Sequence, residues 1–344
     1  MGVEMIDFRS DTLTRPDAGM LEAMMKARVG DDVFGEDPTI KELEGELAGI
    51  FSMEAALFCP SGTMANQIAL AVHTRPGDEV ICAEGSHIYM YEGGGPAANA
   101  GISVQLLPGD CGRLNAAQIK EAVKPDNPHY PRTSLVSLEN TCNRGGGSVY
   151  NYGDLSEISE FCRGAGLSIH LDGARIFNAL AAQSDYTAKD IGRWFDSVSV
   201  CLSKGLGAPV GTVLLGNKVF IANALRVRKR WGGGMRQAGY LAAAGLYALR
   251  NNIRRIAIDH NWASQLAAVL STASFCAYII PPQTNIVVVG LKSDYKVESV
   301  LNALQSKGIA AIGFGADQIR FVTHLDISEE AMLQALQIIK GWQY

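Results

Sequence analysis

A single lysine follows an apolar segment in the middle of the chain. Residues 196–207 read DSVSVCLSKGLG, so the run from Ser197 to Leu202 is typical of a buried strand, and Lys204 stands just beyond its end. A lysine at the solvated end of a strand is common and needs no function. A partly desolvated lysine, however, loses its proton more readily, becomes a nucleophile and can capture a carbonyl group. The chemistry of Lys204 therefore depends on what else lies at that edge of the sheet.

An aspartate ends a second apolar segment. In LSIHLDGAR (167–175), Asp172 precedes Lys204 by about one strand and one helix. Aspartates here often cap the next helix. Alternatively, a carboxylate facing a pyridine nitrogen keeps that nitrogen protonated, which makes the ring of pyridoxal phosphate a better electron sink. Because functional residues of open α/β sheets gather at the carboxyl ends of strands, both side chains could line one edge.

Two further strand ends carry suitable groups. The turn PSGTMAN (60–66) opens a helix after AALFC, and its Ser61, Gly62 and Thr63 would offer hydroxyl and N–H groups to a phosphate. His87, in GSHIYMYEGGG after the strand EVICAE, could lie on a cofactor ring or could be a surface loop residue.

The elements around these residues predict an α/β fold. Apolar runs alternate with helix-like segments, and one such helix can be capped by Asp154 and ended by Gly164 or Gly166. Strands that are apolar on both faces predict a mostly parallel sheet covered on both sides. After PPQT (281–284) the pattern indicates a smaller α/β domain. We expect an N-terminal arm over 1–30, a large domain over 31–240 and a small C-terminal domain over 241–344.

Composition excludes several other classes of protein. The net charge of −5 gives no footprint for nucleic acid or anionic membranes, and no apolar stretch reaches the ~18 residues that span a bilayer. The seven cysteines form no CxxC pair, which favours reduced thiols in the cytoplasm, and no cluster has metal-ligand spacing. GLGAPVG (205–211) looks like a dinucleotide loop, but Pro209 and a strand follow where a helix should begin.

The four strand-end features follow one another in the order typical of aminotransferase-like, fold type I, pyridoxal phosphate enzymes. Along nearly its whole length the sequence resembles the low-specificity L-threonine aldolases. The resemblance rests on DFRSDTLTRP (7–16), GDDVFGEDPT (30–39), PSGTMANQIAL (60–70), SLEN (137–140), HLDGARIFNA (170–179), CLSKGLGAPVG (201–211), GGGMRQAG (232–239) and RFVTHLD (320–326). The loop over 140–151 departs from the family pattern by being rich in glycine.

The resemblance implies a large domain with a mostly parallel seven-stranded sheet and a smaller α/β domain. It implies a pyridoxal 5'-phosphate enzyme that cleaves L-threonine and L-allo-threonine to glycine and acetaldehyde. It also implies a homodimer or homotetramer with sites at subunit interfaces.

Roles in cofactor binding follow from the same resemblance. Lys204 would form the Schiff base, Asp172 would pair with the ring nitrogen, and His87 would stack on the ring and take part in catalysis. The remaining cofactor contacts would come from Ser61, Gly62, Thr63, Arg175, Lys229 and Arg236.

Roles in substrate binding are also implied. Ser10, Arg175 and Arg320 would hold the substrate carboxylate, and His129 would lie near the substrate hydroxyl and share in catalysis. The base that takes the hydroxyl proton stays open between His87 and a water held by His87 and His129. An aminotransferase, a β-eliminating lyase or a decarboxylase would share Lys204 and Asp172, whereas a non-catalytic binding protein would not need the whole set.

Overall fold

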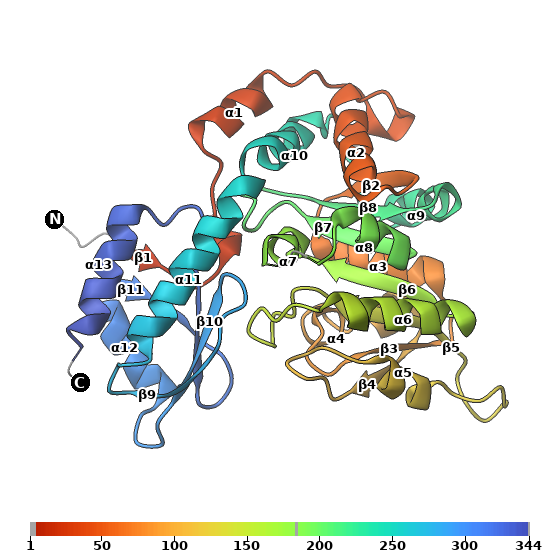
Figure 1. Cartoon of the computed structure of the whole chain (residues 1–344). Coiled ribbons are helices and arrows are strands. Elements are labelled where there is room, and N and C mark those ends of the chain that lie inside the picture. The colour runs from red at the N-terminus through yellow and green to blue at the C-terminus, as the bar shows by residue number, and fades with distance from the viewer. Residues whose placement is uncertain (1–4, 183–184, 343–344) are drawn as a thin grey trace.

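The chain folds into two lobes, each built around its own sheet (Figure 1). The computed structural model describes residues 5–182 and 185–342. The larger lobe contains a seven-stranded sheet with the strand order β2 (Ala55–Cys59), β8 (Thr212–Gly216), β7 (Ser197–Cys201), β6 (Ser168–Gly173), β5 (Thr133–Glu139), β3 (Glu79–Ala83), β4 (Ser103–Leu107).

This sheet confirms the mostly parallel sheet predicted from the sequence. β8 runs antiparallel to both of its neighbours, and the other neighbouring strands are parallel. The carboxyl ends of β5, β6 and β7 therefore meet at one edge. The strand β7 is buried along its whole length, as its apolar sequence predicts.

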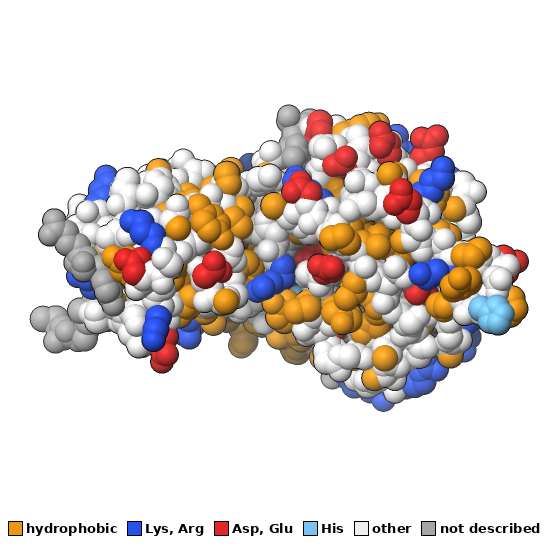
Figure 2. All heavy atoms as spheres, turned by 90° about the horizontal axis from the view of Figure 1, so that it is seen from below, with side chains coloured by type: hydrophobic (Ala, Val, Ile, Leu, Met, Phe, Trp, Pro, Cys, Tyr) orange, Lys and Arg blue, Asp and Glu red, His pale blue; other side chains and the backbone are white. Residues whose placement is uncertain are grey.

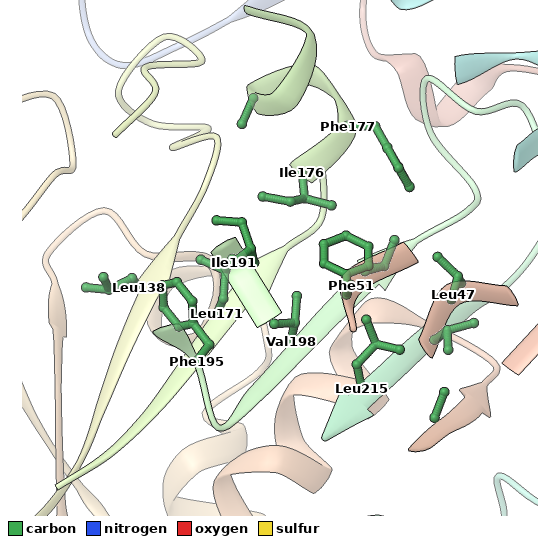
Figure 3. Packing of buried hydrophobic residues seen from close by; sticks show 14 of the residues in the cluster. Leu47, Phe51, Leu138, Leu171, Ile176, Phe177, Ile191, Phe195, Val198 and Leu215 are labelled. Atoms are coloured by element: carbon green, nitrogen blue, oxygen red, sulfur yellow. The ribbon is translucent and has the colours of Figure 1, made fainter. Parts of the chain in front are cut away.

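Helices cover both faces of the large sheet. On one face lie α3 (Gly62–His73) and α9 (Lys218–Arg230), which pack on β2 and β8. The other face carries α2 (Pro38–Phe51), α5 (Ala116–Ala122), α6 (Tyr152–Gly164), α7 (Ile176–Ala182) and α8 (Ala188–Trp194). Figure 3 shows side chains of α2, such as Phe51, packed beside Val198 and Leu215 of the strands.

The start of α6 differs from the sequence prediction. Asn151, rather than Asp154, caps the helix, because its side-chain oxygen accepts the Asp154 N–H at 2.8 Å. The helix therefore begins one turn earlier, and it ends at Gly164 as expected.

The smaller lobe has an antiparallel sheet with the order β12 (Ile312–Gly313), β13 (Gln318–Val322), β10 (Ile286–Leu291), β9 (Cys276–Ile280). Its helices are α11 (Ile256–Leu270), α12 (Val297–Ser306) and α13 (Glu329–Lys340). The chain start joins this lobe, because β1 (Ile6–Asp7) pairs in parallel with β11 (Ile309–Ala310), and Phe8 lies in the same core.

The helix α10 (Gly239–Asn251) bears on the division into domains. It packs against α2 and α1 (Ala18–Met25), and its Ala242 and Leu246 belong to the core of the larger lobe. A boundary at 240 would cut this helix from the core in which it is buried. We therefore propose that the large domain extends through α10 and that the small domain begins near α11.

The surface carries charges of both signs. On the face shown in Figure 2, acidic side chains are frequent over the upper part of the larger lobe, and basic side chains lie among them and along its lower rim. Among the described residues, no helix has the length and apolar character needed to cross a membrane.

Candidate active site

A pocket of about 390 Å³ lies between the carboxyl ends of the large sheet, the N-terminal arm and the small sheet. It brings together five residues that the sequence singled out, although they come from five separate segments. These are Ser10, His87, Arg175, Lys204 and Arg320. Its other lining residues include Glu139, Asn143, Arg144 and Phe314, which sequence reasoning did not assign to a site.

Lys204 is held by its backbone beyond the end of β7. Its carbonyl oxygen accepts the Gly207 N–H at 2.8 Å and the Thr14 hydroxyl of the N-terminal arm at 2.9 Å. Gly207 has a φ of 80°, and a Cβ there would lie 2.6 Å from a side-chain carbon of Leu325. The turn therefore needs glycine at this position, which leaves the half-buried lysine side chain directed to the pocket it lines.

Asp172 is not a helix cap. Its Oδ1 accepts the Ala174 N–H at 3.0 Å, its Oδ2 accepts the Asn66 amide at 2.8 Å, and the next helix begins only at Ile176. The side chain is buried, and in the described part of the chain no cation forms an ion pair with it. A buried carboxylate held by neutral donors fits a cationic ring nitrogen, because such a partner would supply the missing charge.

His87 begins the short helix α4 (His87–Met90). Its Nδ1 lies 3.0 Å from Glu92 Oε1, and its backbone N–H donates to Glu139 Oε2 at 2.7 Å. Burial alone would lower the pKa of His87, but the bond to Glu92 and the nearby carboxylates of Asp172 and Glu139 raise it above its usual value.

Glu139 ends β5 as Asp172 nearly ends β6, and both are buried. Burial and the Asp172 carboxylate raise the pKa of Glu139 to about 7, while the N–H groups of Asn143 and His87 donate to it and limit the rise. The signal in the sequence was an acidic residue at the end of an apolar run, in SLEN. This signal is the same one that identified Asp172.

His87, Glu92 and Asp172 also place potential metal-ligand atoms within 4.8 Å of one another. Spacing along the sequence did not reveal this group, because its third member, Asp172, comes from a distant segment. The Asn66 amide nitrogen already donates to both carboxylates, at 2.9 Å to Glu92 and 2.8 Å to Asp172.

Arg175 is paired within the protein. Its Nε and Nη2 donate to the two oxygens of Asp11 at 2.7 and 2.6 Å, and both residues are buried. Burial alone would raise the pKa of Asp11, but the Arg175 cation lowers it to about 2. Sequence reasoning missed Asp11 because an acidic residue in an N-terminal arm gives no sign of burial.

Arg320 reaches the same pocket from β13 but has only neutral acceptors. Its Nη1 donates to Asn143 Oδ1 at 2.8 Å and its Nη2 to the Arg9 carbonyl at 3.2 Å, whereas its buried Nε has no partner among the described residues. Burial and the Arg175 cation lower the pKa of Arg320 to about 10. An unpaired buried guanidinium fits a carboxylate ligand, which it can bind with two parallel hydrogen bonds.

The predicted phosphate turn opens α3. Ser61 caps the helix by accepting the Met64 N–H at 3.2 Å, so the N–H groups of Gly62 and Thr63 lack intrahelical acceptors. A Cβ at Gly62 would lie 2.9 Å from the sulfur of Cys201, which is itself 3.7 Å from Lys204 Nζ. The turn therefore approaches the end of β7 closely, and its free N–H groups fit an anionic group.

Asp172 and the turn over 61–63 lie beside this pocket without lining it, and three other predicted residues lie away from it. His129 lies in an exposed turn before the amino end of β5, whereas the pocket lies at the carboxyl ends of the strands. Lys229 is exposed in the last turn of α9, and Arg236 is exposed and pairs with Asp31 at 2.9 Å. The buried cation of this region is Arg228, which binds Asp32 at 2.8 Å and the Phe58 carbonyl at 2.6 Å.

Comparison with known proteins gives one consistent family. The family model described as beta-eliminating lyase matches residues 7–293. The low specificity L-threonine aldolase of Escherichia coli K12 is 43% identical over 340 residues, which cover 98% of each chain. A probable low-specificity L-threonine aldolase 2 of Arabidopsis thaliana is 41% identical over 334 residues, covering 95% of this chain and 94% of the relative.

A solved structure shares the fold. The threonine aldolase of Leishmania major superposes with a TM-score of 0.84 at 23% identity, covering 97% of this chain and 98% of the other. The predicted aminotransferase-like, fold type I architecture is thus confirmed. The identity to the curated relatives extends over nearly the whole chain, and the chain therefore belongs to the low-specificity L-threonine aldolase family.

Proposed function

We propose that this protein is an aldehyde-lyase that cleaves L-threonine, L-allo-threonine and related β-hydroxy-α-amino acids to glycine and an aldehyde. The observation that carries the proposal is the meeting of Lys204, His87 and the unpaired Arg320 in one pocket of a chain 43% identical to a named aldolase. An amine, an imidazole and a carboxylate-binding cation are the groups that this reaction needs.

The cofactor is pyridoxal phosphate, which supplies a carbonyl group for the amine and a protonated ring that accepts the electron pair left at Cα. Lys204 would hold its carbonyl carbon, Asp172 its ring nitrogen, and the N–H groups of Gly62 and Thr63 its phosphate. His87 would lie against the ring.

Arg320 would orient the substrate. Its unpartnered Nε and its bond to the neutral Asn143 leave the guanidinium free to bind the carboxylate. Ser10, whose hydroxyl lies 2.8 Å from that of Thr12, would bind the same group. By holding the carboxylate, Arg320 and Ser10 would fix the orientation of the substrate and so select the Cα–Cβ bond as the one that breaks.

His87 would move the proton. Because Glu92 Oε1 faces Nδ1, a neutral His87 donates from Nδ1 and keeps its lone pair on Nε2. That nitrogen, directly or through a water, would take the β-hydroxyl proton as the Cα–Cβ bond breaks and the aldehyde leaves. A proton added afterwards at Cα would give glycine. We assign this step to His87 because it lines the pocket of its own chain, whereas His129 lies at the opposite edge of the sheet.

The exposed Lys229 and Arg236 support an oligomer. These cations lie outside the pocket of their own chain, where a second copy could receive them, so we propose a homodimer or homotetramer with sites at the interfaces. The described cysteines are free, which is consistent with a cytoplasmic enzyme of amino-acid metabolism that forms glycine while degrading threonine.

The test is the product formed from L-threonine by the purified protein. We expect glycine and acetaldehyde in equal amounts, without a keto acid co-substrate, and a visible cofactor band that Lys204→Ala removes together with turnover. Release of ammonia with a keto acid would instead indicate the alternative, a β-eliminating lyase, and a requirement for a second keto acid would indicate an aminotransferase.

A further inference from the structure

A buried row of polar side chains lies between α3 and the large sheet. His170 and Asp172 alternate along β6, Ser197 and Ser199 alternate along β7, and the register pairs His170 with Ser197 and Asp172 with Ser199. Residues two apart on a strand share a face, so all four point to the same side of the sheet.

The helix above contributes two more polar side chains to this row. Asn66 and His73 are two turns apart on α3 and hydrogen-bond to the row below. Around them the layer is apolar, with Leu70 and Ile68 fully buried. A run of mutually bonded polar groups in such a layer must satisfy its own donors and acceptors.

The carboxylates of Asp172 and Glu92 determine which group donates in each hydrogen bond of Asn66. Asp172 and Glu92 can only accept when ionised, so the Asn66 amide nitrogen faces them and its oxygen faces His170 Nε2 at 3.2 Å and Ser199 Oγ at 2.8 Å. Because an amide oxygen only accepts, Nε2 of His170 must carry hydrogen.

The hydrogen bonds continue from His170 toward the amino ends of β6 and β7. Burial lowers the pKa of His170 to about 4, so Nδ1 of the neutral ring accepts the Ser197 hydroxyl at 2.8 Å. The Ser197 oxygen then accepts from His73 Nε2 at 2.7 Å. His73 stacks on Phe220 and lines a hollow near Ser168 and Asp196, at the amino ends of β6 and β7.

All the donors therefore point one way: His73 to Ser197, Ser197 to His170, His170 to Asn66, and Asn66 to Asp172. Hydrogen bonds aligned in a chain polarise one another, and donors directed at a carboxylate favour its ionised form. The donor groups from His73 to Asn66 carry no net charge, so they support the Asp172 carboxylate without competing with a cationic ring nitrogen. A directly bound arginine would neutralise it.

We propose that Asn66, Ser197 and His170 are positioning residues that keep Asp172 ionised and aimed at the cofactor ring, through a one-way hydrogen-bond chain that begins at His73. The proposal rests on the proposed function, since it assigns Asp172 to the ring nitrogen. Its tests include measurements that do not depend on aldolase turnover.

The first test compares two replacements of His170 in the holoenzyme. The amide nitrogen of glutamine can take the place of Nε2, so His170→Gln keeps the donor to Asn66, whereas His170→Phe removes it. For His170→Phe we expect the visible cofactor band to shift and kcat to fall on the order of 10-fold, as for loss of one bond to a charged group. The KM for L-threonine should stay within about 2-fold, since the carboxylate of the substrate is bound elsewhere. His170→Gln should retain the wild-type band and most of kcat.

The control is Ser159→Ala, which removes a buried hydrogen bond of 2.9 Å from the Ser159 hydroxyl to the Trp194 carbonyl. This bond is not part of the hydrogen-bond chain that leads to Asp172. Ser159→Ala should lower thermal stability without moving the band or kcat. The proposal is wrong if His170→Phe, like this control, lowers only the thermal stability. It is also wrong if both His170 variants lose kcat equally while the band is unchanged, because the hydrogen-bond chain would then be only a structural feature.

The second test reads hydrogen positions directly. In holoenzyme labelled with ¹⁵N-histidine, His170 and His73 should both be neutral with hydrogen on Nε2, and signals missing in His170→Gln and His73→Gln would assign them. Hydrogen on Nδ1 of either ring, or a charged ring at neutral pH, would overturn the directed chain. Because this test needs no substrate, it can fail while aldolase activity stands, and it can succeed if the activity proves to be another one.

Discussion

The two walls of the pocket hold their buried arginines in different ways. On the wall from the large sheet, Arg175 forms a two-bond ion pair with the buried Asp11. On the wall from the small sheet, Arg320 binds the neutral oxygens of Asn143 and Arg9, and its Nε has no partner in the part of the chain that the structure describes.

The contrast separates a structural cation from a binding one. A buried ion pair is self-sufficient, whereas a buried cation without a counter-ion costs free energy that a bound anion recovers. Arg175 therefore ties the N-terminal arm to the large sheet, and Arg320 is the cation that a substrate carboxylate would complete. The same contrast recurs around Phe58 of β2, where Arg228 is paired with Asp32 while the half-buried Glu44 of α2 accepts the Phe58 N–H at 2.8 Å and forms no ion pair among the described residues.

The largest expected effect comes from removing the counter-ion of Arg175. Asp11→Asn would leave the Arg175 cation buried without a counter-ion, so the free energy of unfolding at pH 7 should fall by about 3 kcal/mol. Since the folded-state pKa of Asp11 is lowered to about 2, the wild-type advantage is present above about pH 4 and is lost as the pH falls through 2. Chemical denaturation at pH 7 measures this effect.

The matched control is Asp7→Asn, which removes an arm carboxylate paired with the exposed Arg9 at 2.6 Å. It should cost less than about 1 kcal/mol, because exposed pairs contribute little. Equal losses for the two variants would contradict the assignment of Arg175 to a structural pair.

Arg320→Lys should affect catalysis rather than stability. An ammonium cannot reproduce the two parallel bonds of a guanidinium, so we expect KM for L-threonine to rise about 10- to 100-fold, kcat to fall, and slow transamination to appear as the Cα–Cβ alignment loosens. Steady-state kinetics and the conversion of cofactor to its amine form measure this. Unchanged kinetics would mean that the carboxylate is held elsewhere.

Glu44→Gln tests the unpaired charge on α2. Burial raises the pKa of Glu44 to about 7, so the folded protein loses stability as the pH rises from about 4.5 to 7. Glutamine can still accept the Phe58 N–H, and the variant should be more stable than wild type by about 1–2 kcal/mol at pH 8. This gain should shrink toward pH 4.5; a gain independent of pH would exclude the charge as its cause.

The smallest expected effect comes from Phe314. The guanidinium carbons of Arg144 and Arg320 lie 4.3 and 5.3 Å from the centre of its ring, which partly compensates the unpaired charge. Phe314→Leu keeps an apolar side chain but loses this attraction, so KM should change by about 2- to 5-fold. Tyr278→Leu, at an exposed ring of the same sheet, should leave KM unchanged.

Local patterns in the sequence determined the sheet and the strand-end chemistry. Apolar runs specify buried parallel strands because both faces must be covered. Asp172 and Lys204, at or just beyond the ends of these strands, lie at the pocket edge of the sheet by the geometry of parallel strands alone. Glu139 carried the same signal as Asp172, an acidic residue at the end of an apolar run. His170, Ser197 and Ser199 carried a different one, an alternation of polar residues within apolar strands, but their partners could not be read from it.

Only the tertiary structure decided which charges are paired. Asp11 meets Arg175, Asn143 meets Arg320, and Asn66 meets Asp172 across more than a hundred residues of sequence. A residue type specifies what a side chain can bond to, but burial and the approach of distant segments specify whether a partner is there. The family resemblance implies that His129 lies near the substrate, and in the single chain the direction of β5 puts it at the opposite edge of the sheet from the pocket, so its role stays a prediction.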